Sequence, residues 1–157
     1  MKIFILLLLI ILSSCNTTKE INNSNFVMIA NPFVDCASLK EAEELASFSI
    51  SLPKELNNKD LIYRVLNTGD KMIEIIQLSD NEKITIRKSK STEDISGVYK
   101  SFDVVKKIIV DDKEVLIKGE KDIFEVAVWI NNGFSYSISS NDGFPLNELQ
   151  ALIKQIK

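Results

Sequence analysis

Two stretches of the chain carry apolar residues at helical spacing, and each predicts a helix. The first opens with the sequence 38–41 (SLKE), a capping box in which Ser38 caps the helix and Glu41 reaches back. Its apolar residues share one helical face and are Leu39, Ala42, Leu45 and Ala46. We expect this helix to end near Ser47. The second begins at about Leu146, and its apolar side consists of Leu146, Leu149, Leu152, Ile153 and Ile156.

Between these helices, apolar residues alternate with polar ones or form short apolar runs, which predicts strands separated by turns. The predicted strands cover residues 48–52, 61–66, 72–78, 84–87, 104–110, 114–117, 123–130 and a last strand from Phe134. The run 123–130 (IFEVAVWI) is the most apolar, so we place it centrally in the sheet. The sequence 131–133 (NNG) predicts a type I′ hairpin.

The last predicted strand alternates three apolar residues with three serines. They are Phe134, Tyr136 and Ile138 on one side, and Ser135, Ser137 and Ser139 on the other. We expect the first side to pack and the serine side to meet water. Residues 88–97 are polar and charged, and are expected to form a loop.

Hairpin-length connections dominate, so the sheet should be mostly antiparallel. The predicted fold is α+β: a mostly antiparallel sheet of about seven strands, packed by a short N-terminal helix and a C-terminal amphipathic helix.

The N-terminus has the pattern of an export signal. Lys2 precedes an unbroken apolar run, 3–12, which as a helix reaches only about 15 Å, half of a bilayer core. The sequence 12–15 (LSSC) follows at once and resembles the lipobox of bacterial lipoproteins. That resemblance implies acyl chains on Cys15 and cleavage between Ser14 and Cys15. An ordinary secretory signal with a chance cysteine is the alternative.

These features divide the chain into three parts. Residues 1–14 are expected to be a lipoprotein signal peptide, residues 15–30 a lipidated cysteine with a polar tether, and residues 31–157 a single α+β domain. The polar stretch 16–25 has a flexible-coil reach of about 17 Å. We therefore expect a domain outside the cytoplasm, in the bacterial cell envelope, whose membrane partner is reached through the lipid on Cys15.

Composition narrows the possible chemistry. The chain contains no histidine, which removes the commonest general base and most zinc sites. Its formal net charge of −3 argues against nucleic acid as a partner. We expect no catalytic residue, metal ligand or cofactor.

Two segments resemble a known family. They are 38–53 (SLKEAEELASFSISLP) and 124–156 (FEVAVWINNGFSYSISSNDGFPLNELQALIKQI). Together they resemble the domain-of-unknown-function family 4367, found in lipoproteins and membrane-anchored proteins of low-GC bacteria. The resemblance implies a fold and an extracytoplasmic setting, and it brings no activity and no catalytic residues.

Several residues are candidate sites, and the pattern around most of them favours a structural role. Cys36 is expected to be buried rather than reactive. The pair Ser51 and Lys54 matches the S-x-x-K pattern of serine acyl-enzymes, with 139–141 (SSN) as its S-x-N element, but Pro53 interrupts it.

The acidic and aromatic candidates also favour structural roles over metal or ligand binding. The acidic pairs expected to make turns rather than bind metal are Asp80/Glu82, Asp111/Asp112 and Asn141/Asp142. Three glutamates, Glu41, Glu43 and Glu44, are expected on a solvated helix face. The aromatic residues expected in the core rather than in a ligand groove are Tyr63, Tyr99, Phe124, Trp129, Phe134 and Tyr136.

The leading hypothesis is a non-enzymatic, membrane-anchored binding or sensing domain with an envelope protein or peptide as partner. A binding surface would lie on the sheet or on the loop 88–97. The alternatives are a small cell-envelope hydrolase and an acyl-chain or lipoprotein carrier-like domain.

Overall fold

Eight strands and two α-helices make up the part of the chain that the computed structural model describes, residues 31–56, 60–79 and 82–157. In chain order the elements are β1 (Phe33–Cys36), α1 (Leu39–Ala46), the 3-10 turn η1 (Lys54–Leu56), β2 (Leu61–Leu66), β3 (Met72–Leu78), β4 (Lys83–Ser89), β5 (Val104–Val110), β6 (Lys113–Glu120), β7 (Ile123–Asn131), β8 (Phe134–Pro145) and α2 (Leu146–Gln155).

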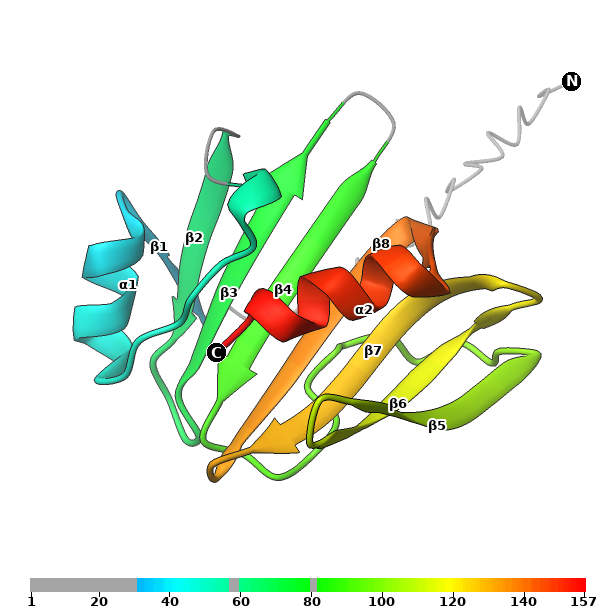
Figure 1. The fold of residues 1–157 in the computed structure, drawn as a ribbon. Helices are drawn as coiled ribbons and strands as arrows, with labels where there is room; N and C mark the ends of the chain where they lie inside the picture. Colours follow the sequence, from blue (N-terminus) through cyan, green and yellow to red (C-terminus); the bar gives the residue numbers. More distant parts are fainter. Residues whose placement is uncertain (1–30, 57–59, 80–81) are drawn as a thin grey trace, which may run out of the picture. The chain divides into compact units, whose positions relative to one another are not determined.

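All eight strands belong to one sheet, in the order β1-β2-β3-β4-β8-β7-β6-β5 (Figure 1). Every neighbouring pair is antiparallel. The predicted α+β class is therefore confirmed, with eight strands in place of about seven. The apolar strand β7 has a neighbour on each side, as its composition indicated.

Local sequence explains how α1 begins and ends. The hydroxyl of Ser38 accepts a hydrogen bond from the Glu41 amide at 3.2 Å. The carboxylate of Glu41 accepts one from the Ala37 amide at 2.7 Å, one residue before the cap. Ser47 closes the helix in the left-handed conformation, with φ 66°, and its N–H bonds the carbonyl of Glu43. The predicted bounds of this helix are confirmed.

The first strand was predicted in the wrong place. Residues 48–52 form no strand, although their apolar residues alternate with serines. The amide of Ile50 donates to the Glu43 carboxylate at 2.9 Å, and that of Ser51 donates to the Lys157 carbonyl at 2.9 Å. These two amides bond a side chain and the end of the chain, so neither is left to pair with a neighbouring strand. The first strand of the described residues is β1, which pairs with β2.

One face of the sheet, called here the inner face, is covered by both helices. A single apolar cluster joins Ala42 and Ala46 of α1, Leu149 and Ile153 of α2, and strand residues such as Ile138. Figure 1 shows α2 lying across β7 and β8. The prediction that the two helices cover the apolar face is confirmed.

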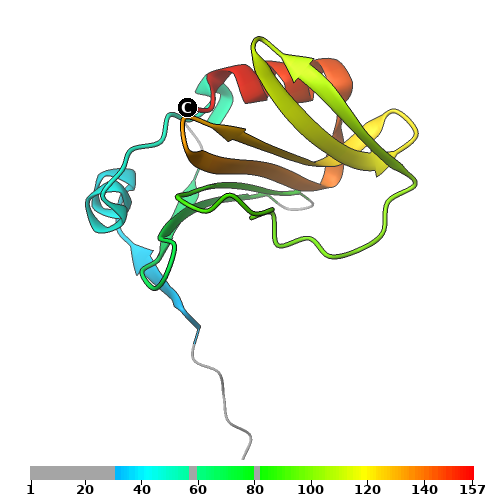
Figure 2. The same cartoon turned by 90° about the horizontal axis from the view of Figure 1, so that it is seen from below.

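The opposite, outer face is also covered, which corrects the expectation for the serine strand. Ser135 is 0% exposed and Ser137 is 1% exposed. The long connection 90–103, called here the outer segment, runs below β7 and β8 in Figure 2, on the side opposite α2. The predicted loop 88–97 begins later than expected, because β4 continues through Ser89.

The outer segment is held by charged groups. Arg87 of β4 donates to the carbonyl of Ile95 at 2.9 Å, and Lys118 of β6 pairs with Asp94 at 2.6 Å. Arg87 also donates through Nε to the Glu74 carboxylate at 2.8 Å. Glu74 is only 4% exposed and the Arg87 side chain 18%, so the carboxylate of this ion pair is buried and its guanidinium is partly buried.

Within the described ranges, no helix is long and apolar enough to cross a membrane.

Candidate functional site

A cavity of about 540 Å³ opens at one end of the sheet, and we call it the lysine pocket. Its charged lining consists of Lys88, Lys113, Lys154, Lys157, Asp111 and Asp112. Uncharged side chains from Asn131, Asn132, Phe134 and Tyr136 complete it. Four lysines against two aspartates give the lining an excess of positive charge.

The antiparallel topology gathers these residues from distant parts of the sequence. The β5–β6 turn at 111–112 and the β7–β8 turn at 132–133 lie at the same sheet end, because β5 and β7 both run toward it. Asn132 and Gly133 have φ values of 51° and 76°, as the predicted type I′ turn requires. The last residues of β4 and the C-terminal end of α2 close the remaining sides.

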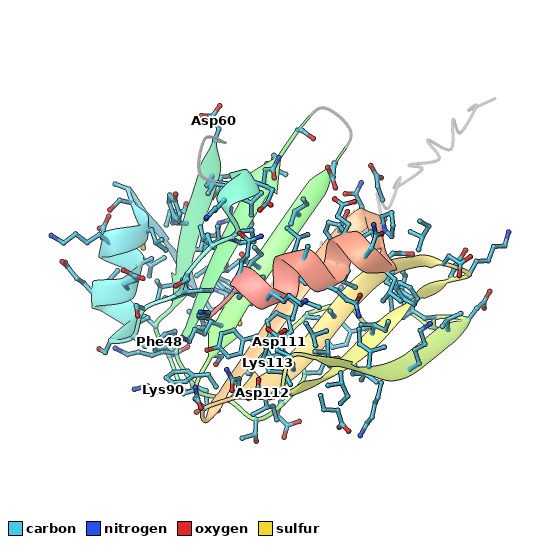
Figure 3. All side chains as sticks on the ribbon, viewed as in Figure 1. Phe48, Asp60, Lys90, Asp111, Asp112 and Lys113 are labelled. Carbon is cyan, nitrogen blue, oxygen red and sulfur yellow. The ribbon has the colours of Figure 1, made fainter. Side chains whose placement is uncertain are left out.

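Figure 3 shows residues of the β5–β6 turn and residues beside β4 at this end of the sheet. Asp111, Asp112 and Lys113 lie close together at the β5–β6 turn. Phe48 and Lys90 lie beyond them in the same view, beside β4. The ammonium of Lys90 is 6.0 Å from the centre of the Phe48 ring.

Lys88 is the most enclosed cation of the pocket, at 7% exposed. Its ammonium donates to the carbonyl of Ser49 at 2.7 Å. Three rings surround it, with centres at 4.6 Å for Phe134, 5.1 Å for Tyr136 and 5.8 Å for Phe48. Ring faces attract a cation, so this cage stabilises the ammonium without neutralising it.

Burial shapes the protonation of two groups in the pocket. It lowers the pKa of Lys88 from the ordinary 10.5, and the negative charge of Glu43 partly offsets this effect. Burial also raises the pKa of Tyr136 above 10.0, so its phenol keeps its proton at neutral pH. The phenol therefore acts as a hydrogen-bond donor near the lysines.

The two enclosed donors of the pocket other than Lys88 lack a protein partner among the described residues. Lys113 is 8% exposed, and its ammonium has no hydrogen bond or ion pair among the residues that the structure describes. The Tyr136 phenol likewise has no hydrogen bond within the described ranges. Its ring stacks on Trp129 at 5.3 Å, with only 4° between the ring planes, which fixes its orientation.

Among the described residues, one ion pair joins the remaining charges of the pocket. Lys154 lies 3.7 Å from Asp111, with both side chains about half exposed, so this ion pair contributes little. An anionic group entering the pocket would meet the free ammonium of Lys113 and a neutral phenol. This arrangement suits the binding of a carboxylate or phosphate group.

The predicted lipidation site, Cys15 with cleavage after Ser14, lies outside the described residues. Cys36 lies within them and is half-buried, less enclosed than expected. Its thiol donates to the Val34 carbonyl at 3.7 Å. Burial raises its pKa above 9.0, and the charges of Glu41 and Asp35 add to this effect. A thiol that keeps its proton is a poor nucleophile.

The S-x-x-K candidate does not form a catalytic pair. Ser51 and Lys54 are both exposed, and no hydrogen bond joins their side chains among the residues described. The S-x-N candidate instead shapes the end of β8. There the Ser140 hydroxyl accepts hydrogen bonds from the amides of Asp142 and Gly143, each at 3.1 Å.

The acidic candidates also have structural roles. No group of three or more potential metal ligands occurs in the described part of the chain. Asp80 lies outside that part, and the carboxylate of Glu82 accepts from the Ser140 hydroxyl at 3.3 Å. Asp111 and Asp112 form a turn as predicted, and also line the lysine pocket. Of the helix glutamates, Glu44 pairs with Lys40 at 3.8 Å.

Most of the aromatic residues belong to the core, as expected. Phe124, Trp129 and Tyr136 are at most 3% exposed, while Tyr63 and Phe134 are half-buried. Tyr99 is the exception: it lies on the outer segment, is 96% exposed, and was wrongly assigned to the core.

The lysines of the pocket were missed because they are scattered in sequence. The apolar side predicted for the last helix excludes Lys154 and Lys157, and Lys88 falls in the predicted loop 88–97. One signal was present, since Lys88 continues the alternation of Ile84 and Ile86 on the inner side of β4. A lysine in that register marks a cation inside the fold.

No family model, curated protein or solved structure matches this chain. The resemblance to the domain-of-unknown-function family 4367 stays a prediction.

Proposed function

We propose that the chain is a lipid-anchored, non-enzymatic binding domain of the bacterial cell envelope, and that its lysine pocket takes an anionic group. The observation that supports this most directly is the pair of unpartnered donors, Lys113 and Tyr136, in a cavity lined by four lysines. Among the described residues, the buried side-chain atoms without a partner are Trp129 Nε1 and Ser135 Oγ, so the Lys113 and Tyr136 donors are open to the cavity, where an anionic group can bind them. The anchor rests on the lipobox-like sequence that ends at Cys15.

The arrangement favours binding over hydrolysis. Lys88 has a lowered pKa, but its ammonium is bonded to the Ser49 carbonyl and enclosed by rings rather than set beside a nucleophile. Neither Ser51 nor Lys54 lines the pocket. The inner face also leaves little room for acyl chains beneath α2, because Leu149 and Ile153 are fully buried there.

Titration with a small polyanion tests the binding site. The full chain in a nonionic detergent is titrated with pyrophosphate, and binding is followed by calorimetry and by amide NMR shifts. We expect shifts at the two turns, 111–112 and 132–133, and about a tenfold loss of affinity in Lys113→Met. Lys40→Met is the matched control, because the Lys40 side chain is 86% exposed on α1. Equal losses of pyrophosphate affinity in both variants would refute the proposal that the lysine pocket binds the anion.

The anchor is tested separately. Wild-type protein should fractionate with membranes and carry acyl chains on an N-terminal Cys15, as mass spectrometry of the N-terminal peptide can show. Cys15→Ser should appear in the soluble extracytoplasmic fraction, because loss of the acyl chains removes membrane affinity. Unchanged fractionation of Cys15→Ser would contradict lipid anchoring and leave the pocket proposal untouched.

A further inference from the structure

The two edges of the sheet differ in how open they are to another strand. β1 forms one edge with four residues. β5 forms the other edge with seven residues, VVKKIIV, of which five are β-branched. A long, regular edge strand with high β-propensity is a template for adding a strand.

The outward backbone groups of β5 can be identified from its turn. Asp111 and Asp112 make a two-residue turn, so Val110 and Lys113 form the first hydrogen-bonded pair with β6. Bonded and non-bonded pairs alternate along an antiparallel ladder. The N–H and C=O groups of Val105, Lys107 and Ile109 therefore face the open edge.

The side chains of these three residues lie on the outer face and remain accessible. Val105 is 55% exposed and Ile109 is 65% exposed. Ile130, two strands away on the same face, is also exposed, at 52%, with the charged Glu114 of β6 between it and Ile109. Lys107 lies between the two exposed aliphatic residues and bonds Glu114 at 2.7 Å, with both side chains more than 60% exposed. This exposed pair is weak and can rearrange.

We propose that β5 is a docking edge for an extended segment of a partner protein. The segment would present an aliphatic, an acidic and an aliphatic side chain at alternate positions. In antiparallel pairing these lie opposite Ile109, Lys107 and Val105. Aliphatic pairs bury exposed apolar surface, and an acidic residue opposite Lys107 makes a favourable cross-strand pair.

A second copy of this chain fits the edge poorly. The antiparallel register that overlaps all seven residues of β5 places Lys107 directly opposite Lys107 of the second copy. Like charges directly opposite each other destabilise a strand pair. The central lysine therefore selects an acidic partner strand and disfavours self-association.

The test uses the full chain in nonionic detergent and two labelled peptides. In the first, valine, glutamate and valine alternate with threonine; in the second, lysine replaces the glutamate. We expect the first to bind about fivefold more tightly. It should also slow amide hydrogen exchange at Val105, Lys107 and Ile109 while leaving β1 unchanged.

Two variants separate strand addition from nonspecific attraction. Lys107→Pro removes an outward N–H without breaking the β6 ladder, and should lower affinity for the first peptide at least about tenfold. Lys107→Glu should reverse the preference between the two peptides. Equal binding of both peptides by wild type and by Lys107→Glu would overturn the proposal. So would a concentration-dependent dimer that Lys107→Pro abolishes.

Discussion

Arg87 and Lys88 are adjacent on β4, yet they point to opposite faces of the sheet and are treated differently by the fold. On the outer face, Arg87 is bonded to the buried carboxylate of Glu74. On the inner face, Lys88 meets three rings and a carbonyl, with no carboxylate within ion-pair distance among the described residues. Arg87 also bonds the Ile95 carbonyl of the outer segment, whereas Lys88 lines the lysine pocket, which we propose an anion enters. Lys88, which has no carboxylate in ion-pair contact among the described residues, therefore points to the proposed binding site better than Arg87 does.

The largest effect is expected from Glu74→Gln. This change removes the counter-charge of Arg87, whose side chain is 18% exposed, and the 3.8 Å ion pair with Arg64, and should lower the free energy of unfolding by about 3 kcal/mol. Urea denaturation monitored by Trp129 fluorescence measures it. Asp35→Asn is the exposed control and should cost less than about 1 kcal/mol, because the Asp35 side chain is 75% exposed.

The inner-face counterpart of that change is Lys88→Met. Methionine keeps the contacts with the rings and removes a desolvated charge, so stability should change by less than about 1 kcal/mol. A loss comparable to that of Glu74→Gln would show that the two cations play the same structural role, and the contrast between the faces would fail.

Gly97→Ala tests whether the outer segment depends on Arg87. Gly97 has φ 69°, and a Cβ there would overlap the Arg87 guanidinium. We expect a loss of about 2 kcal/mol from the left-handed conformation and the displaced ion pair together. Gly69→Ala is the matched control, because Gly69 has φ 61° but open space around a Cβ; it should cost about 1 kcal/mol. Equal losses would mean that the segment is not fastened through Arg87.

Local sequence signals predicted most of the fold. The capping box of α1, the Asn131-Asn132-Gly133 hairpin and the apolar side of α2 depend on neighbouring residues alone. The errors arose where distant segments decide the outcome. Residues 48–52 have strand-like alternation, but Glu43 and Lys157 accept hydrogen bonds from the amides of Ile50 and Ser51. The serines of β8 alternate as an exposed face would, but the outer segment covers them.

The site was less predictable than the fold for the same reason. Its lysines come from β4, β6 and the end of α2, and only the strand order brings them together. No local pattern distinguishes Lys113 from an ordinary surface lysine beside a turn.

A smaller effect is expected in the pH dependence of anion binding. A protonated Lys88 attracts an anion, so affinity should fall as pH rises through a pKa that lies below the ordinary 10.5. In Lys88→Arg the guanidinium keeps its charge, so the fall should move to higher pH. Calorimetric titration with pyrophosphate at a series of pH values measures this shift. Superimposable profiles for wild type and Lys88→Arg would exclude Lys88 from anion binding.

Anomalous diffraction from crystals soaked in tungstate tests most directly whether the lysine pocket is an anion site. We expect a tungsten peak within hydrogen-bonding distance of the Lys113 ammonium and the Tyr136 phenol, and its loss in Lys113→Met crystals. A pocket without a peak, with tungstate bound only at exposed lysines such as Lys40, would contradict the account.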